Sequence, residues 1–132
     1  MAPRTVDDLL ADARRGLRRV DPHGANEATA AGGVLVDIRS EAQRARDGVV
    51  PGSVFIARNV LEWRADPASP WRDSRIADRG REIVVMCDEG YQSSLAAATL
   101  QELGLERATD VIGGFQAWRA AGLPVEPERP LP

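Results

Sequence analysis

The sequence predicts one α/β domain with an open, mainly parallel sheet and helices on both faces of that sheet. Two short and mostly apolar runs, residues 34–38 (VLVDI) and 82–86 (EIVVM), lack the alternating polar positions of a half-exposed strand, which indicates strands buried on both faces. Segments with the apolar spacing of helices lie between such runs, as the crossover connections of parallel strands require. The length of 132 residues suits one core and is too short for two.

The composition excludes several classes of function. The 17 basic and 20 acidic residues give a net charge of -3, so no positive excess is available for binding nucleic acid phosphates. All 17 basic residues are arginines, which excludes a lysine Schiff base or a lysine general base. His23 is the only histidine and is expected on an exposed turn, so we predict no metal site and no cofactor.

The cysteine content and the start of the chain bear on the compartment. One cysteine cannot form an internal disulfide, and acidic residues follow the start of the chain where a secretory signal would be apolar. No apolar run approaches the roughly 18 residues of a membrane-spanning helix. We therefore expect a cytoplasmic protein with no membrane partner.

Helix-start signals and glycine stops mark the elements along the chain. Thr5 and Ser40 each stand three residues before a side chain that can complete a capping box. Asp21 precedes Pro22, a favourable order of N-cap and first helical residue. We expect helices over residues 5–19, 22–31, 41–47, 60–64, 93–103 and 115–121, strands over 34–38, 53–56, 82–86 and 108–112, and irregular structure over 66–80.

Polar residues before two of the predicted helices are expected to cap them, and the chain is expected to divide into three parts. Asn59 is predicted to cap the helix 60–64, and Ser93 and Ser94 to cap the helix 93–103. The four arginines between residues 14 and 19 are interpreted as a solvated basic face. The predicted parts are an amphipathic helix on or beside the domain (1–20), the domain itself (21–125) and a flexible proline-rich tail (126–132).

The candidate site is centred on Cys87, where the buried strand 82–86 becomes a loop that leads into a helix. Backbone N–H groups at such a turn favour an anion, including the thiolate form of cysteine, which is the nucleophile. Gly90 supports a tight turn because glycine tolerates a positive φ. Asp37 and the turn 113–114 also fall at the carboxyl ends of strands and should share this edge, where ligands of open α/β sheets bind. The alternative is that Cys87 is a small buried side chain that ends a strand.

Four segments of this chain resemble the single-domain rhodaneses, a family of sulfurtransferases. Residues 48–53 (GVVPGS) resemble the family's G-H-I-P-G-A segment, and residues 111–118 (VIGGFQAW) resemble its V-x-x-G-G-x-x-x-W ending. The other two are residues 36–39 (VDIR), with Glu41 nearby, and the strand and loop 84–93 (VVMCDEGYQS). The resemblance covers about residues 20–125 and implies the rhodanese-like α/β fold.

The resemblance also implies a persulfide shuttle. The Cys87 thiolate would take the outer sulfur of a small donor or a protein persulfide and pass it to cyanide or a thiol acceptor. Asp37, Arg39 and Arg58 are candidates for pocket lining or structural support, and fixing neighbouring loops is the favoured role of Asp37 and Arg39. The loop that would bind the persulfide through its amides consists of Asp88, Glu89, Gly90, Tyr91, Gln92 and Ser93.

Several positions depart from the family pattern. Gln92 stands where arginine is frequent, Asp88 and Glu89 where basic residues are frequent, and Val49 where histidine is usual. Acidic neighbours oppose ionisation of the thiol, and the missing guanidinium weakens attraction for a dianion such as thiosulfate. We therefore expect a working thiolate for which thiosulfate is a poor donor.

Two other functions compete with the sulfurtransferase. A phosphatase or arsenate reductase of the related loop type needs an arginine six residues after the cysteine to grip an oxyanion, and this chain has Ser93 there. The second is a catalytically weak rhodanese-like binding or regulatory module. The acidic loop and Gln92 favour such a module, whereas the presence of Cys87 and Gly90 opposes it.

Overall fold

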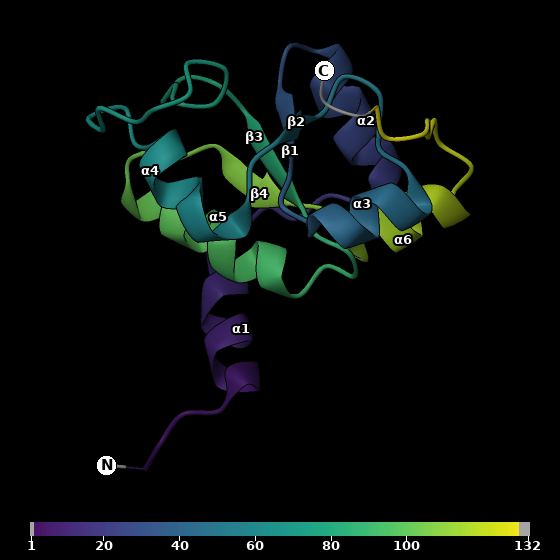
Figure 1. Cartoon of the computed structure of the whole chain (residues 1–132). Helices are drawn as coiled ribbons and strands as arrows, with labels where there is room; N and C mark the ends of the chain where they lie inside the picture. The colour runs from purple at the N-terminus through teal and green to yellow at the C-terminus, as the bar shows by residue number, and fades with distance from the viewer. Residues whose placement is uncertain (1, 130–132) are drawn as a thin grey trace.

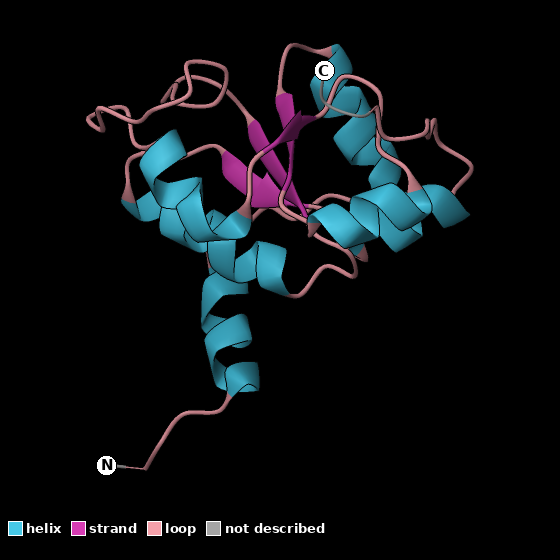
Figure 2. Ribbon diagram, viewed as in Figure 1, coloured by secondary structure: helices cyan, strands magenta, loops and turns pink. Residues whose placement is uncertain are grey.

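Four parallel strands form one sheet in the order β2-β1-β3-β4, with helices on both faces (Figures 1 and 2). The computed structural model describes residues 2–129. The strands are β1 (Val34–Asp37), β2 (Val54–Phe55), β3 (Ile83–Met86) and β4 (Ala108–Asp110). The helices are α1 (Val6–Arg15), α2 (Pro22–Ala30), α3 (Glu41–Asp47), α4 (Leu61–Ala65), α5 (Gln92–Glu102) and α6 (Gly114–Ala120), with a 3-10 helix η1 (Arg58–Val60). The predicted fold class is confirmed.

Alternate residues of the central strand β3 enter two cores on opposite faces of the sheet. Ile83 and Val85 pack with buried residues of α4 and α5, and Cys87 continues this side. Val84 and Met86 pack with α2 and α6 on the other side. The four strand residues have no exposed surface. Helices cover both faces, which is why the sequence of this strand shows no polar alternation.

The register of the sheet places Cys87 between the ends of two flanking strands. Asp37 of β1 is level with Met86, and Asp110 of β4 is level with Val85. Because all strands run parallel, these carboxyl ends meet at one edge of the sheet, as predicted.

The local helix-start signals at three positions are confirmed. Thr5 and Ser40 each form a complete capping box, in which the hydroxyl and the side chain three residues later satisfy each other's backbone N–H groups. Asp21 accepts a hydrogen bond from the Gly24 N–H at 2.7 Å, with Pro22 as the first residue of α2. These signals involve residues that are close in the sequence, so they form regardless of the tertiary structure.

The caps predicted at Asn59, Ser93 and Ser94 are wrong. Asn59 lies inside η1, and no side chain caps the start of α4. Helix α5 begins at Gln92, so both serines lie in its first turn, where their hydroxyls donate to the Asp110 carboxylate at 2.7 and 2.8 Å. Hydrogen bonds to a buried charged group are stronger than those to a backbone N–H, which explains the outcome.

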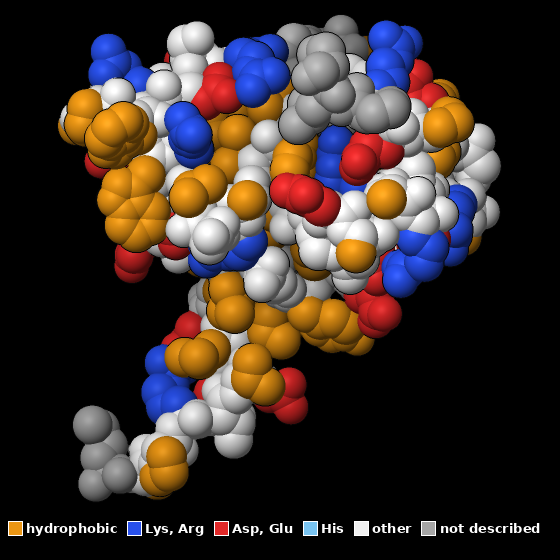
Figure 3. All heavy atoms as spheres, in the orientation of Figure 1, with side chains coloured by type: hydrophobic (Ala, Val, Ile, Leu, Met, Phe, Trp, Pro, Cys, Tyr) orange, Lys and Arg blue, Asp and Glu red, His pale blue; other side chains and the backbone are white. Residues whose placement is uncertain are grey.

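The two ends of the described chain are held differently. Helix α1 packs against α5 and projects from the domain, with Val6 62% and Leu9 44% exposed (Figures 1 and 3). At the other end, Glu126 exchanges two backbone hydrogen bonds with Val49, and Glu128 pairs with Arg44 at 3.3 Å. The segment expected to be flexible is thus attached to the domain as far as Glu128, and residues 130–132 lie outside the described part. Every helix within residues 2–129 is too short or too polar to cross a membrane.

The close approach of α6 to the cysteine loop gives a prediction about stability. Gly114 is the first residue of α6 and Gly122 follows the end of this helix, with φ values of 60° and 75°. A Cβ at Gly114 would lie 2.5 Å from the Cys87 carbonyl oxygen, whereas a Cβ at Gly122 would meet nothing within 4 Å. We predict that Gly122→Ala lowers the free energy of unfolding by about 1–2 kcal/mol through backbone strain alone. Gly114→Ala should cost about 1–3 kcal/mol more, because the loop must move. Urea denaturation measures both losses, and equal losses would contradict the close approach.

Candidate active site

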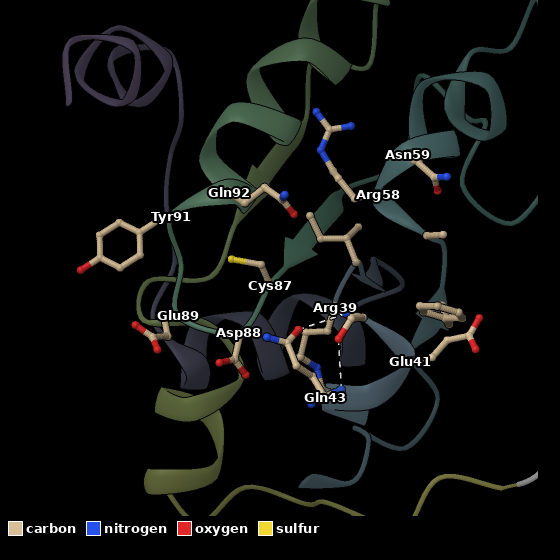
Figure 4. Close-up of a pocket in the computed structure, with 14 residues that line it drawn as sticks. Arg39, Glu41, Gln43, Arg58, Asn59, Cys87, Asp88, Glu89, Tyr91 and Gln92 are labelled. Atoms are coloured by element: carbon tan, nitrogen blue, oxygen red, sulfur yellow. Dashed lines mark hydrogen bonds between the residues drawn. The ribbon is translucent and has the colours of Figure 1, made fainter. Parts of the chain in front are cut away.

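A cavity of about 740 Å³ opens at the carboxyl edge of the sheet (Figure 4). Its walls are the segment from β1 into α3, the end of β2 with η1, and the loop between β3 and α5. The predicted site residues that line it are Arg39, Arg58, Cys87, Asp88, Glu89, Tyr91 and Gln92. The remaining predicted residues, Asp37, Gly90 and Ser93, are buried beside it and do not line it.

Cys87 is 7% exposed and lies where β3 ends. The Gly90 N–H donates a hydrogen bond to its Sγ at 3.1 Å. Gly90 has a φ of 88°, and a Cβ there would lie 2.6 Å from the Gly113 nitrogen. The turn that aims this N–H at the sulfur therefore requires glycine for both its backbone conformation and its close packing.

Among the described residues, the other backbone amides of the loop donate no hydrogen bond to the Cys87 sulfur. Of the amides expected to face the sulfur, the Gly90 N–H is the one that donates to it. Within residues 2–129, the N–H groups of Glu89 and Tyr91 donate no hydrogen bond. Both residues line the cavity, so we expect their N–H groups to be donors for an anion bound there.

The first acidic residue of the loop is held on the α6 side. Gln116 of α6 donates through Nε2 to the Asp88 carboxylate at 2.9 Å and to Asp47 at 3.1 Å. Figure 4 shows Asp88 and Glu89 on this side of the loop and Gln92 on the other. The structure thus assigns Gln116, which has no signal in the sequence, the role of fixing Asp88.

Asp37 and Arg39 form a fully buried ion pair beneath the cavity. Arg39 donates through Nε and Nη2 to the two carboxylate oxygens at 3.1 and 2.9 Å, and Arg44 adds a hydrogen bond at 2.7 Å. The Arg39 guanidinium also donates to the Gly48 carbonyl at 2.8 Å and lies 3.7 Å from the Phe115 ring centroid. These contacts fix the start and end of α3 against the sheet and against α6, as charge-assisted bonds between loops do.

The charged side chains around the cavity give it no positive excess. Arg58 donates to Glu62 at 2.8 Å, and both side chains are 28% exposed. The charged lining residues are Arg39, Arg58, Glu41, Asp88 and Glu89. The lining thus contains three acidic side chains and two guanidinium groups. Each guanidinium is paired with a carboxylate that does not line the cavity, Arg39 with Asp37 and Arg58 with Glu62.

Behind the loop lies a buried cluster around Asp110 at the end of β4. Its carboxylate is fully buried and accepts hydrogen bonds from the hydroxyls of Ser93 and Ser94. Arg19 donates to the two carboxylate oxygens at 2.9 and 3.3 Å. The cluster therefore ties the first turn of α5 to β4 and to the segment between α1 and α2.

Two of the four arginines interpreted as a solvated face contact the cysteine loop, so that interpretation is wrong for them. Arg14 and Arg19 each donate through Nη2 to the Gly90 carbonyl at 3.0 Å. Arg15 and Arg18 are exposed, as expected. Nothing in the local sequence distinguishes the two pairs, because the contact depends on how the segment folds back onto the loop.

The fold and the site define a parallel α/β protein with one nearly buried cysteine at a strand-to-loop-to-helix junction. The family model of the Rhodanese-like domain matches residues 21–121, and the chain belongs to this family.

Individual relatives agree with this membership. The chain is 34% identical to Thiosulfate sulfurtransferase GlpE of Pseudomonas savastanoi pv. phaseolicola, over 78% of this chain and 88% of that protein. It is 33% identical to a protein named Sulfurtransferase from Allochromatium vinosum, over 70% of this chain and 77% of that one. The chain spans most of both relatives.

Solved structures extend the comparison. A protein of unknown function from Rhodopseudomonas palustris, described as a possible tyrosine phosphatase, superposes with a TM-score of 0.87 and 34% identity, over 96% of this chain and 97% of that one. A rhodanese-related protein from Thermoplasma volcanium has a TM-score of 0.67 and 27% identity, over 84% of this chain and 99% of that one. A match over 96% of the chain must include at least part of α1, which precedes the residues that the family model covers.

The carboxylate that shares Gln116 with Asp88 gives a pH prediction. Hydrogen bonds from Arg46, and then from Gln116, lower the pKa of Asp47 from 3.8 to about 2. Because the folded state binds this proton less readily than the unfolded state, the stabilisation is complete above about pH 4 and is lost toward about pH 2. We predict that Asp47→Asn weakens the fall in the free energy of unfolding over this range. Urea titrations at several pH values test this, and Glu106→Gln, an exposed acid, should keep the original slope.

Proposed function

We propose that this protein is a sulfurtransferase that carries a sulfane sulfur as a persulfide on Cys87. The observation that carries the proposal is the Cys87 sulfur at the cavity, with the Gly90 N–H 3.1 Å away, in a domain of the rhodanese-like family. The relatives named sulfurtransferases support the same reaction class.

The reaction consists of two displacements at sulfur. In the first, the Cys87 thiolate attacks the outer sulfur of the donor, a new S–S bond forms, and the old bond breaks with its electron pair on the leaving group. For thiosulfate the leaving group is sulfite. In the second, cyanide or an acceptor thiolate attacks the terminal sulfur of the persulfide, and the electron pair of the breaking S–S bond returns to Sγ. The thiolate is thereby restored without any external oxidant or reductant.

The backbone of the loop is the expected source of charge stabilisation. The terminal sulfur of a Cys87 persulfide is anionic. Glu89 and Tyr91 line the cavity, and their N–H groups donate no hydrogen bond within residues 2–129. Fixed amide donors around a developing anion act as an oxyanion hole does for oxygen. The Gly90 N–H stabilises the thiolate from which the persulfide forms and to which it returns.

The charge of the lining bears on the donor. A small dianion gains little from a cavity whose side chains carry more acids than bases, and Asp88 and Glu89 repel it. A protein persulfide or another thiol-derived persulfide carries less negative charge at the reacting end. We therefore propose such a donor, with a thiol acceptor, over thiosulfate.

A catalytically weak binding or regulatory module is the second candidate, and the acidic lining is the observation that favours it. The phosphatase alternative has less support, because the hydroxyl of Ser93 at the position of the required arginine is buried and donates to Asp110. The protein from Rhodopseudomonas palustris is described as a possible tyrosine phosphatase, and that description concerns that protein alone.

Sulfur loading is the direct test of the proposed function. We predict that incubation with a low-molecular-weight persulfide adds one sulfur atom to Cys87, that cyanide removes it, and that Cys87→Ser takes up none, since the chain has no other cysteine. Intact-protein mass spectrometry detects the adduct. A chain that stays unmodified with every donor tested would support the binding module instead.

Thiosulfate kinetics test the origin of the donor preference. We predict that Gln92→Arg lowers the KM for thiosulfate about two- to fivefold, the usual range for one exposed charge pair. Glu102→Gln, at the exposed far end of α5, makes the same change in net charge away from the cavity and should leave this KM unchanged. An equal drop in both variants would mean that net charge, and not the loop, controls thiosulfate affinity.

A further inference from the structure

The carbonyl of Gly90 receives two positively charged donors from the N-terminal segment. Arg14 is in the last turn of α1 and Arg19 follows that helix, and the Nη2 of each lies 3.0 Å from this oxygen. The same residue donates its N–H to the Cys87 sulfur. Gly90 is therefore the point where the N-terminal segment meets the reactive thiol.

We propose that Arg14 and Arg19 are positioning residues for the Cys87 thiol and that they act through the Gly90 backbone. The inference rests on the proposed function, in which Cys87 is the reactive group. Both arginines precede residue 21, where the match to the family model begins. The N-terminal segment thus contributes to the site as well as packing beside the domain.

The mechanism follows from the covalent structure of the loop. The N–H and the C=O of Gly90 belong to two neighbouring peptide units, which its φ and ψ angles connect. Fixing the C=O with two charged donors restricts the rotation of the residue and so keeps its N–H aimed at Sγ. Without these bonds, the left-handed conformation of a glycine is one of many accessible states.

The arginines also polarise the next peptide unit. The Gly90 carbonyl shares its peptide with the Tyr91 N–H, and a carbonyl that accepts charged hydrogen bonds makes that N–H a stronger donor. The Tyr91 N–H has no acceptor among the described residues, and Tyr91 lines the cavity. The two arginines thus bring positive charge to the backbone of the loop, whose own charged side chains, Asp88 and Glu89, are both acidic.

Each arginine is itself held in place. Arg19 is 17% exposed and pairs with the buried Asp110. Arg14 donates through Nε to the Ser94 hydroxyl at 3.0 Å and lies over the Tyr91 ring, 5.9 Å from its centroid. Removing Arg19 leaves a buried carboxylate without its cation, which threatens the fold. Arg14 contacts no buried charge, so its variants carry the test.

The test is the alkylation of Cys87 by iodoacetamide, measured against pH without any sulfur donor. The chain has one cysteine, so the rate reports on that thiol alone. We expect Arg14→Gln to slow alkylation at neutral pH about three- to tenfold, as the weakening of one hydrogen bond predicts. The rise of the alkylation rate with pH should also shift to higher pH. Arg14→Lys should restore part of the rate. Arg18→Gln, an exposed arginine four residues along, is the matched control and should react as the unaltered protein does.

Thermal unfolding of each variant separates positioning from a structural role. A folded Arg14→Gln variant with a lower midpoint of unfolding and an unchanged pH curve of alkylation would overturn the inference. The outcomes for the two proposals are distinct. If Cys87 takes up no sulfur but Arg14→Gln still slows alkylation, the sulfurtransferase proposal fails and the positioning role stands. If sulfur loading succeeds while alkylation is the same in all variants, the positioning role fails.

Discussion

The buried carboxylate of Asp110 is the constraint on which the cysteine loop depends. A charge without exposed surface is tolerated in a folded protein only when ionic and hydrogen-bonding partners surround it. The two nitrogens of Arg19 and the hydroxyls of Ser93 and Ser94 supply these partners. They come from the segment before α2 and from the first turn of α5, so satisfying one carboxylate fixes the end of the loop that begins at Cys87.

A second buried aspartate has the corresponding position on the other side of Cys87. Strands β1 and β4 flank β3, and their last residues, Asp37 and Asp110, are both fully buried. Asp37 is surrounded by Arg39 and Arg44, which hold α3 at the opposite wall of the cavity. Because each carboxylate is neutralised within its own cluster, both act as anchors for the walls of the cavity and contribute little net charge to it.

The sequence is informative where the determining contacts are local. Capping boxes join residues three apart, and burial of both faces of β3 follows from four consecutive apolar residues, so these features are visible without a structure. The place of Cys87 follows from its own strand and from Gly90. The Asp110 cluster joins residues 16, 17 and 91 positions apart, and this contact overrides the local preference of Ser93 and Ser94 for N-cap positions. The same holds for Arg14, which local pattern does not distinguish from its solvated neighbour Arg15.

The attraction of the cavity for an anion is expected to come mainly from its backbone. Its two lining guanidinium groups, Arg39 and Arg58, are each paired with a carboxylate, and the acids on the loop carry the opposite sign. An amide dipole weakens with distance faster than a full charge, so it holds an anion in contact but attracts one weakly from solution. In the proposed reaction, such a site stabilises a terminal sulfur that is already bound to Cys87 better than it captures a free dianion. Delivery of that sulfur would then fall to contacts between the donor and the surface around the cavity, which is the physical basis for proposing a protein-bound persulfide over thiosulfate as the donor.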